Sequence, residues 1–447
     1  MIFAQMKIIA YLCIPKTCGK SHLFGIRYIQ MKIQRDIYLN RIIESRHNGM
    51  IKVITGVRRS GKSYLLFNLF VDWLKESGID DRHIVRIDLE DRRNRGLRNP
   101  DTLLEHIDSQ MTDDRMYYIL IDEIQLADEF EDVLNSYLKI GNADVYVTGS
   151  NARFLSKDVI TTFRGRGEEI KVYPLNFREF MSATEKSTEL AFEEYMTYGG
   201  LPQILQYKSE ERKSEYLKAL FTETYITDIK ERYQVKNDEE LEILLDIISS
   251  NIGALTNPHK LSKTFESEKK VKLTDKTIKT YLDYVCDSFL VEKAQRYDVK
   301  GKKYIDTPYK YYFIDLGLRN ARLNFRQLEK SHMMENVIYN ELRVRGFNVD
   351  VGVVPIFIRD ETGKSKRMSY EIDFVCNRGN QRYYIQSAYR LDSEDKIRQE
   401  KNSLQNVDDS FKKIIIVGNP ILVERDNDGI TQISLYDFLL KENSLEL

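Results

Sequence analysis

The stretch IKVITGVRRSGKSYLLFNLF, residues 51–70, decides the fold class of this chain. Its first five residues are mostly apolar and β-branched, which predicts a buried strand. Gly56-x-x-x-x-Gly61-Lys62-Ser63 follows, and the residues after it place apolar side chains at helical spacing. A strand, a glycine loop and a helix in this order are typical of a phosphate-binding loop, in which backbone N–H groups close around an anion at a helix N-terminus.

This loop and the residue after it make up the predicted nucleotide site. Its residues are Gly56, Val57, Arg58, Arg59, Ser60, Gly61, Lys62, Ser63 and Tyr64. We expect Lys62 to reach the β- and γ-phosphates of ATP and the Ser63 hydroxyl to ligate Mg²⁺. TCGKS at residues 17–21 imitates part of the motif, but it lacks the upstream glycine and is excluded as a second site.

A phosphate loop needs a metal-holding acid on a neighbouring strand. MYYILIDEIQ, residues 116–125, predicts a buried strand that ends at Asp122 and Glu123. We expect Asp122 to hold Mg²⁺ through water and Glu123 to activate the attacking water as general base. An acid pair at a helix N-terminus would have the same sequence. The upstream loop favours the catalytic interpretation.

A third polar strand end lies in ADVYVTGSN, residues 143–151. Ser150 and Asn151 are candidates for sensing the γ-phosphate and positioning water. A simple turn after a strand has the same spacing, so both interpretations stay open. Alternation of strands and helices over this region predicts a parallel sheet with helices on both faces and the ligand at the carboxyl ends of the strands.

Two arginines follow in a glycine-rich segment, FRGRG, at residues 163–167. Arg164 or Arg166 could stabilise the charge of phosphoryl transfer, either in its own subunit or on a neighbour in a homo-oligomer. The alternative is a solvated surface loop, and the sequence does not separate the two.

Five motifs together carry a resemblance: GVRRSGKS, LIDEIQ, VTGSN, FRGR with YPLNFREF, and YGGLP. They resemble the AAA-type ATP-binding proteins of the archaeal-ATPase class, which are prokaryotic P-loop ATPases related to signalling NTPases. The resemblance covers nearly everything from Met31 onward. It implies ATP binding and a C-terminal domain of unknown function more firmly than any cellular role.

We expect an α/β chain in four parts. Residues 1–30 are a leader, disordered or a mis-assigned start, because Met31 runs straight into an amphipathic helix. Residues 31–200 form the P-loop ATPase domain, residues 201–320 a helical and winged-helix domain, and residues 321–447 a restriction-endonuclease-like domain that lacks catalytic activity.

The winged-helix prediction rests on helical patterns at residues 241–252, 257–265 and 275–289, followed by two strand-like runs around a basic turn. In such a domain the third helix enters the major groove and the wing contacts phosphate. Five lysines could serve DNA in this way: Lys276, Lys279, Lys300, Lys302 and Lys303. Three acids share the third helix, namely Asp275, Asp283 and Asp287. They favour a packing module over a DNA reader.

The terminal segment SYEIDFVCNRGNQRYYIQSAY, residues 369–389, stops short of a nuclease motif. Glu335 on a predicted helix and Asp373, with Glu371 beside it, follow the order of a restriction-endonuclease-like fold, where carboxylates hold Mg²⁺. Gln386 and Ala388 stand where that fold carries an acid and a lysine. Lys396 is a remote substitute. Glu335 and Asp373 are therefore either fold-stabilising or a weak metal site.

Composition excludes few functions. Lys+Arg (68) and Asp+Glu (69) nearly cancel, so any basic surface is local. Cys13, Cys18, Cys286 and Cys376 form no disulfide or zinc pattern, which favours a reducing cytoplasm, and no segment predicts a membrane span. The leading function is an ATPase switch for a protein partner. DNA binding or cleavage, and a static ATP-binding module, are the alternatives.

Overall fold

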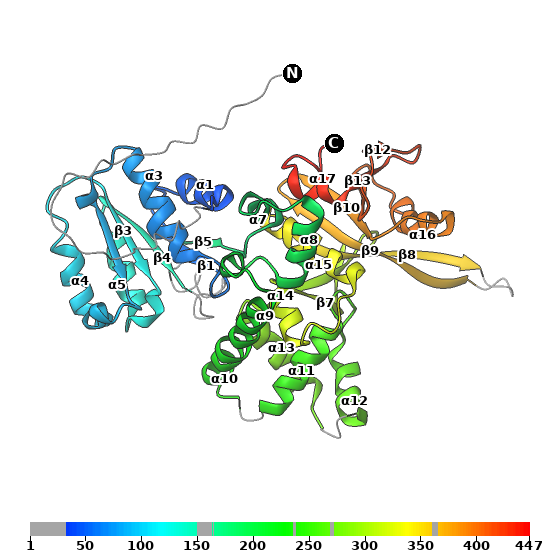
Figure 1. Cartoon of the computed structure of the whole chain (residues 1–447), viewed down its shortest axis with the longest axis horizontal. Helices are drawn as coiled ribbons and strands as arrows, with labels where there is room; N and C mark the ends of the chain where they lie inside the picture. The colour runs from blue at the N-terminus through cyan, green and yellow to red at the C-terminus, as the bar shows by residue number, and fades with distance from the viewer. Residues whose placement is uncertain (1–32, 150–162, 164, 236–237, 269–271, 360–364) are drawn as a thin grey trace, which may run out of the picture. The chain divides into compact units, whose positions relative to one another are not determined.

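The computed structural model describes residues 33–149, 163, 165–235, 238–268, 272–359 and 365–447 (Figure 1). The predicted leader, residues 1–30, lies outside them. The first sheet is wholly parallel, with strand order β2-β3-β4-β1-β5. Its strands are β1 (Ile51–Thr55), β2 (Ile84–Asp88), β3 (Tyr117–Asp122), β4 (Ala143–Thr148) and β5 (Gly167–Lys171). The predicted parallel sheet is confirmed.

Helices cover both faces of this sheet because its strands alternate their side chains between two cores. On β3, Tyr118 and Leu120 pack with the helical segment after the phosphate loop, whereas Ile119 and Ile121 belong to a separate core. The helices of the first face are α1 (Asp36–Glu44), α2 (Lys62–Tyr64), η1 (Leu65–Phe70) and α3 (Val71–Glu76). Those of the second are α4 (Pro100–Asp108) and α5 (Phe130–Tyr137).

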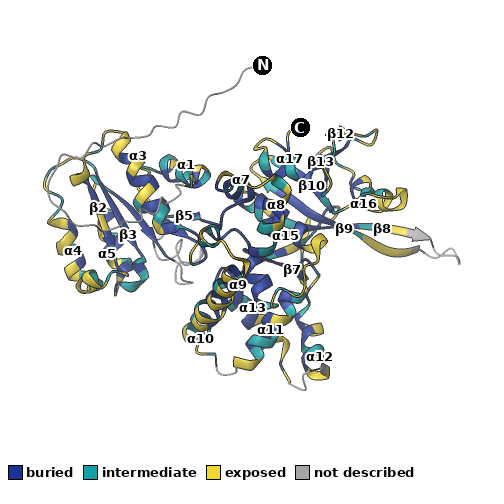
Figure 2. Ribbon diagram, viewed as in Figure 1, coloured by how far each residue is buried: buried dark blue, intermediate teal, exposed yellow. Residues whose placement is uncertain are grey.

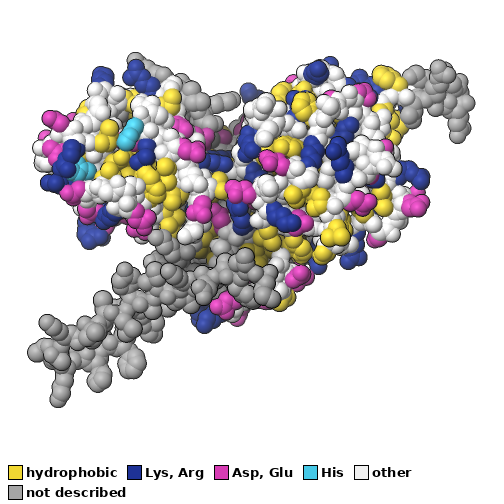
Figure 3. Space-filling view, turned by 90° about the horizontal axis from the view of Figure 1, so that it is seen from above, with side chains coloured by type: hydrophobic (Ala, Val, Ile, Leu, Met, Phe, Trp, Pro, Cys, Tyr) yellow, Lys and Arg dark blue, Asp and Glu magenta, His cyan; other side chains and the backbone are white. Residues whose placement is uncertain are grey.

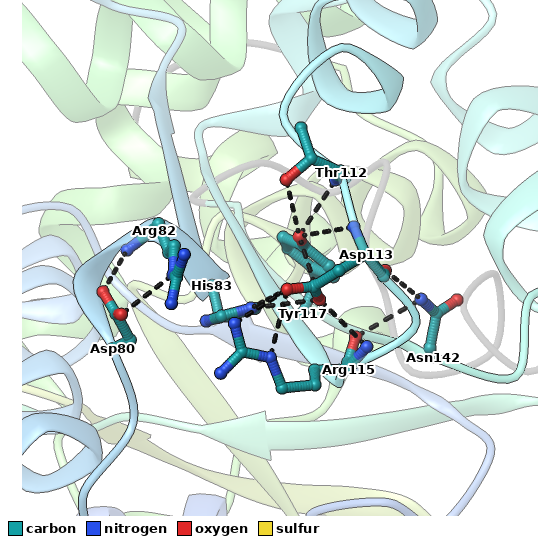
Figure 4. A network of polar contacts seen from close by, with 8 residues as sticks. All are labelled: Asp80, Arg82, His83, Thr112, Asp113, Arg115, Tyr117 and Asn142. Carbon is teal, nitrogen blue, oxygen red and sulfur yellow. Dashed lines mark hydrogen bonds and ion pairs between the residues drawn. The ribbon is translucent and has the colours of Figure 1, made fainter.

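A polar network joins the amino ends of three strands, opposite the phosphate loop (Figure 4). His83 precedes β2, Tyr117 begins β3 and Asn142 precedes β4. Asp113 lies between them: its carboxylate is 3.2 Å from His83 Nε2, and its carbonyl accepts from Asn142 Nδ2. Arg115 donates to the same carboxylate at 2.7 Å. These contacts fix the starts of the three strands. Because the strands are parallel, their carboxyl ends lie together at the opposite edge of the sheet.

The middle of the chain is helical. It comprises α7 (Phe177–Ser182), α8 (Thr188–Tyr198), η6 (Pro202–Gln206), α9 (Glu210–Ala219), η7 (Leu220–Ile226), α10 (Thr227–Tyr233), α11 (Asp238–Ser250), α12 (Pro258–Glu268) and α13 (Asp275–Asp287). Thr274 accepts from the Thr277 N–H and caps α13, as predicted. The three helical patterns of the sequence thus correspond to α11, α12 and α13, which begin and end within three residues of the predicted bounds.

The second sheet has eight strands in the order β12-β13-β11-β10-β9-β8-β6-β7. They are β6 (Val291–Asp298), β7 (Lys303–Phe313), β8 (Asn348–Arg359), β9 (Ser365–Arg378), β10 (Gln381–Ala388), β11 (Lys412–Val417), β12 (Glu424–Arg425) and β13 (Ile430–Ser434). The hairpin β6–β7 joins this sheet because β6 pairs in parallel with β8. The predicted boundary at residue 320 therefore falls between strands of one sheet.

Two helices lie on opposite faces of the second sheet. Helix α15 (Lys330–Val344) buries its side chains with Phe374 and Ile385, whereas α16 (Glu394–Gln405) places Leu404 in a separate core. Two further helices of the described residues are α14 (Leu316–Arg322) and α17 (Leu435–Leu440). Figure 2 shows the central strands buried and the outer helix faces exposed. On the face seen in Figure 3, Lys and Arg alternate with Asp and Glu, in keeping with a net charge of −1.

The YGGLP motif holds the helical region against the hairpin. Gly199 has a φ of +76°, and a Cβ there would lie 2.1 Å from the Asp315 carboxylate. Asp315 accepts from the Gly200 N–H at 2.8 Å and caps α14. Only glycine permits this approach. None of the helices in the described ranges is long and apolar enough to span a bilayer.

Candidate functional site

The phosphate loop lies at the carboxyl end of β1, where the backbone takes conformations that favour glycine. Gly56 has a φ of +137°, and a Cβ there would lie 2.0 Å from the Val172 carbonyl oxygen. Gly61, at φ +94°, leads into α2. Arg59 also has a positive φ, +65°, although it is not glycine. Such backbone strain is typical of loops shaped for a ligand.

Lys62 is buried at the centre of the loop. Its Nζ donates to the carbonyl oxygens of Gly56 and Val57, each at 3.0 Å. Burial lowers the pKa of Lys62 to about 8, although Glu123 and Asp122 act against this shift. An ammonium in this position can exchange its carbonyl partners for phosphate oxygens, which bind it more strongly because they are charged.

Asp122 and Glu123 meet the end of β4 through one hydroxyl. Thr148 Oγ1 donates to Asp122 Oδ1 at 2.5 Å and accepts from the Glu123 N–H at 2.9 Å. Glu123 has a φ of +50°, a backbone conformation that residues other than glycine rarely adopt. Its carboxylate accepts a hydrogen bond from Gln125 Nε2. Thr148 therefore fixes both acids.

The Asp122 carboxylate is suited to a hard cation. Burial raises the pKa of Asp122 to about 6, while hydrogen bonds from Thr148 and Ser63 lower it. Ser63 thus contacts Asp122, the acid that was predicted to hold Mg²⁺ together with it. A hydroxyl and a carboxylate beside a phosphate cradle are the donor set that Mg²⁺ takes in P-loop proteins. These residues fit the metal.

Residues far from the loop in sequence hold it in place. Arg35, which is buried, donates from Nη1 to the Ser60 carbonyl at 2.8 Å. Tyr225 of η7 donates to the Arg58 carbonyl at 3.1 Å, and Arg58 Nε lies 2.7 Å from Asp228 of α10. Arg35, Tyr225 and Asp228 were not predicted, because no local sequence signal marks them.

The other predicted site residues separate into two groups. Ser150, Asn151 and Arg164 lie outside the described residues. Thr148, two residues before Ser150, is the strand-end hydroxyl that the structure places on the acids. Tyr64 follows the loop on α2, and its side chain packs against the first core.

Arg166 lies at the opposite edge of the sheet from its own phosphate loop. Its carbonyl accepts from the Ile51 N–H at 2.9 Å, beside the first residue of β1. Because β1 has five residues, roughly 16 Å of strand separates Arg166 from Gly56. The alternative of a role in its own subunit therefore does not fit this geometry. A role on a neighbouring subunit and a solvated surface loop are the two alternatives left.

A second polar cluster lies in the eight-stranded sheet. Lys310 Nζ of β7 is 2.9 Å from Glu335, 2.9 Å from Glu371 and 3.6 Å from Asp373. Burial would lower the pKa of Lys310, but the three acids outweigh it and raise the pKa. Burial and the charge of Glu335 raise the pKa of Asp373 to about 7, although Lys310 acts to lower it. Gln386 accepts from the Asp373 N–H at 3.3 Å.

This cluster brings together the acids that the sequence predicted, with a lysine that it did not. The predicted substitute, Lys396, instead pairs with Glu400 on its own helix, at 3.7 Å. Ala388 is buried in the core. Within the described ranges, His, Cys, Asp and Glu form no group of three or more arranged for a metal ion.

The fold and the first site define an AAA-type P-loop domain. Residues 48–181 match the AAA domain family, and residues 189–329 match a domain of unknown function (DUF8612). The chain belongs to the same family as an uncharacterized protein of Haemophilus influenzae, with which it is 34% identical over 92% of this chain and 99% of that one.

Two further similarities reach most of the chain. An uncharacterized protein of Methanocaldococcus jannaschii is 29% identical over 88% of this chain and 89% of its own. Among solved structures, a Walker-type ATPase of Pyrococcus abyssi aligns with 65% of this chain and 96% of its own, at 15% identity and a TM-score of 0.46.

Proposed function

We propose that the chain is a Mg²⁺-dependent ATPase in which nucleotide turnover changes the binding of a partner by the terminal part of the chain. The observation that carries the ATPase proposal is the meeting of Lys62, Ser63, Asp122 and Glu123 at one edge of the sheet, with Thr148 holding the two acids. Lys62 would bind the β- and γ-phosphates, while Ser63 and Asp122 would hold Mg²⁺. Bound Mg²⁺ would neutralise charge on the phosphates.

Glu123 is the residue to which we assign general base catalysis. Its N–H is fixed by Thr148, and its carboxylate is held by Gln125. A base must lie within reach of the water it deprotonates, and the constrained backbone at Glu123 presets that orientation. Arg166, and Arg164 beside it, would then act on a neighbouring subunit of a homo-oligomer.

A chain of polar contacts supports the switch proposal. Arg35 bonds the Ser60 carbonyl of the phosphate loop and, through Nη2, the Tyr173 carbonyl at 2.6 Å. Tyr173 Oη donates to Glu292 of β6 at 2.6 Å, and Arg343 of α15 donates to the same carboxylate at 2.8 Å. Movement of the loop on ATP binding would thus act on α15.

Glu292 is the centre of this chain. Burial would raise the pKa of Glu292, but Lys171 and Arg343 outweigh it and hold the pKa below its ordinary value. Because the carboxylate stays charged, it must keep its donors, and a displaced donor would be costly. A group that must keep its hydrogen-bond donors transmits the displacement of one donor to the others, and this makes Glu292 suitable for coupling two domains.

The proposal is tested by comparing trapped and hydrolysed states. Glu123→Gln should bind ATP without turning it over, whereas wild type should release ADP. Hydrogen exchange in α15 and β6 should then differ between the ATP-bound variant and ADP-bound wild type. Absent turnover in wild type, together with identical exchange, would favour a static ATP-binding module instead.

DNA cleavage by the terminal domain is the second candidate function. The observation that favours it is Lys310, which lies beside the acids that the sequence assigned to a restriction-endonuclease-like fold. We rank it second because Lys310, Glu335 and Asp373 are buried and already paired with one another. Mg²⁺- or Mn²⁺-dependent cleavage of duplex DNA that is lost in Asp373→Ala but kept in Lys62→Ala would establish it.

A further inference from the structure

Two β-hairpins reach the same end of the eight-stranded sheet. Strand β6 runs parallel to β8, so both end on one side, and the Val299 N–H donates to the Val353 carbonyl at 3.0 Å. The β6–β7 turn, residues 299–302, therefore lies beside the point where β8 leaves the sheet. We call residues 354–359 of β8 and 365–371 of β9 the arm.

The arm is a two-stranded ribbon. Strand β6 pairs with β8 only as far as Val353, and β10 pairs with β9 only from Phe374 on. Along the arm each strand pairs with the other alone, down to Arg359 and Ser365. Figure 1 shows β8 and β9 running out past the other strands. The arm extends roughly 20 Å beyond Val353, and a ribbon of this kind has little stability by itself.

Large apolar side chains on the arm are exposed. Phe357 is 74% exposed and Met368 is 44% exposed. Phe357 pairs with Arg367 across the ribbon, so an aromatic ring and a guanidinium share one face, while Ile356 and Met368 share the other. Figure 2 shows exposed surface along the arm. Phe357 and Arg367 are therefore the candidate contact groups of one face, and Met368 belongs to the other.

The charge around these side chains is mainly positive. Lys366 and Arg367 are exposed on the arm, where the one described acid, Glu371, is held by Lys310. The adjacent turn and the start of β7 add exposed lysines at Lys300, Lys302 and Lys303. Of these, Lys300 is paired with Asp408 at 3.4 Å, and an exposed Asp306 follows on β7. Next to the lysines, Tyr304 is 60% exposed.

We propose that the arm and the β6–β7 turn bind duplex DNA, with the arm in the major groove and the turn on the phosphate backbone. The major groove of B-DNA admits a two-stranded β-ribbon, whereas that of A-form RNA is too deep and narrow for side chains to read. Cations on both hairpins match the phosphates, and Phe357, on the same face as Arg367, provides apolar contact with thymine methyl groups. This inference goes beyond the proposed ATPase.

The test is fluorescence anisotropy of a labelled DNA duplex of about 20 base pairs with full-length protein over a range of salt. The variant Lys366→Glu/Arg367→Glu should weaken binding at least tenfold near 0.1 M salt. The slope of log affinity against log salt should fall by about 2. Phe357→Ala should weaken binding with an unchanged slope. Arg212→Glu/Lys218→Glu on α9 changes the net charge equally and should leave binding unchanged.

Three results would overturn the proposal. The first is no duplex binding at low salt. The second is loss of binding in Lys276→Glu/Lys279→Glu on α13 while the arm variants bind normally, because the surface of α13 would then carry the DNA. The third is equal affinity for duplex RNA. Lys62→Ala, in which ATP binding is removed, should still bind DNA, so failure of the ATPase proposal and failure of this one are distinguishable.

Discussion

Lys310 Nζ lies 2.9 Å from Oε1 of Glu335, and Tyr312 Oη donates to the same oxygen at 2.7 Å. Glu371 and Asp373 complete the surroundings of the ammonium. A tethered cation thus stands among the acids that would otherwise repel one another. We regard Lys310 as the internal counter-ion of this cluster, supplied by a strand that the sequence analysis assigned to a different domain.

Lys310→Met should therefore destabilise the protein by about 3–5 kcal/mol, because removing one partner of a buried ion pair leaves uncompensated charge. Chemical denaturation measures the loss. Adding Asp373→Asn should restore part of the stability, since one of the repelling charges disappears. If Lys310→Met unfolds at the same denaturant concentration as wild type, Lys310 is not the counter-ion.

Lys62→Ala should weaken ATP binding at least ~100-fold, because a charge-assisted contact to the phosphates disappears. Titration with a fluorescent ATP analogue measures this change. Lys139→Ala removes an exposed lysine of the same domain and is the matched control. A Lys62→Ala protein that is folded and binds ATP normally would remove Lys62 from the site.

Thr148→Val should lower kcat by about 10–100-fold, as loss of an outer-shell hydrogen bond does at metal sites. The hydroxyl bonds Asp122 and the Glu123 N–H, so valine releases both acids while keeping the side-chain shape. Thr148→Ser keeps the hydroxyl and should stay near wild type. Equal rates in the valine and serine variants would mean that the bridge does not position the acids.

Acid pH should weaken Mg²⁺ binding through Asp122, whose pKa is raised to about 6 by burial. Protonated Asp122 cannot ligate, so each pH unit below this value should raise the Mg²⁺ requirement of the ATPase about tenfold. Because the folded pKa is raised, protonation stabilises the fold, and this contribution is lost as pH rises through 6. A Mg²⁺ titration at pH 5.5 and 7.5, with an unfolding control at each pH, separates the two effects. A Mg²⁺ requirement that is equal at both pH values would contradict the assignment.

Arg166→Ala should bind ATP normally and lose turnover if Arg166 acts across a subunit interface. Mixing this variant with Glu123→Gln should then restore part of the rate, because some mixed interfaces contain an intact base and an intact arginine. Unrestored activity on mixing, with both variants folded, would leave Arg166 as a surface residue. The same experiment with Arg164→Ala distinguishes the two arginines.

The elements that the sequence predicted are those whose chemistry is local. Gly56, Lys62 and Asp122 stand in short motifs at strand ends, so their mutual placement follows from a parallel sheet. Thr148 was partly predicted, since polar side chains at the end of this strand were expected at Ser150 and Asn151. Arg35 lies 25 residues from Ser60 in the sequence, with no motif between them to pair the two.

The contact of Lys310 with the acids of the terminal domain was not predicted, for a related reason. The sequence places this lysine in a strand of the β6–β7 hairpin, and a hairpin after three helices is typical of a wing. Pairing of β6 with β8 draws that hairpin into the terminal sheet and its lysine onto Glu335 and Asp373. Such non-local strand pairing depends on burial of whole faces and not on nearby residues.

The place of β6 in the eight-stranded sheet also bears on where the chain can be cut for expression. A cut at residue 320 would separate β6 from β8 and leave the edge of β8 unpaired, and a bare edge of this kind invites aggregation. A fragment that carries the terminal strands should therefore begin before Val291, the first residue of β6.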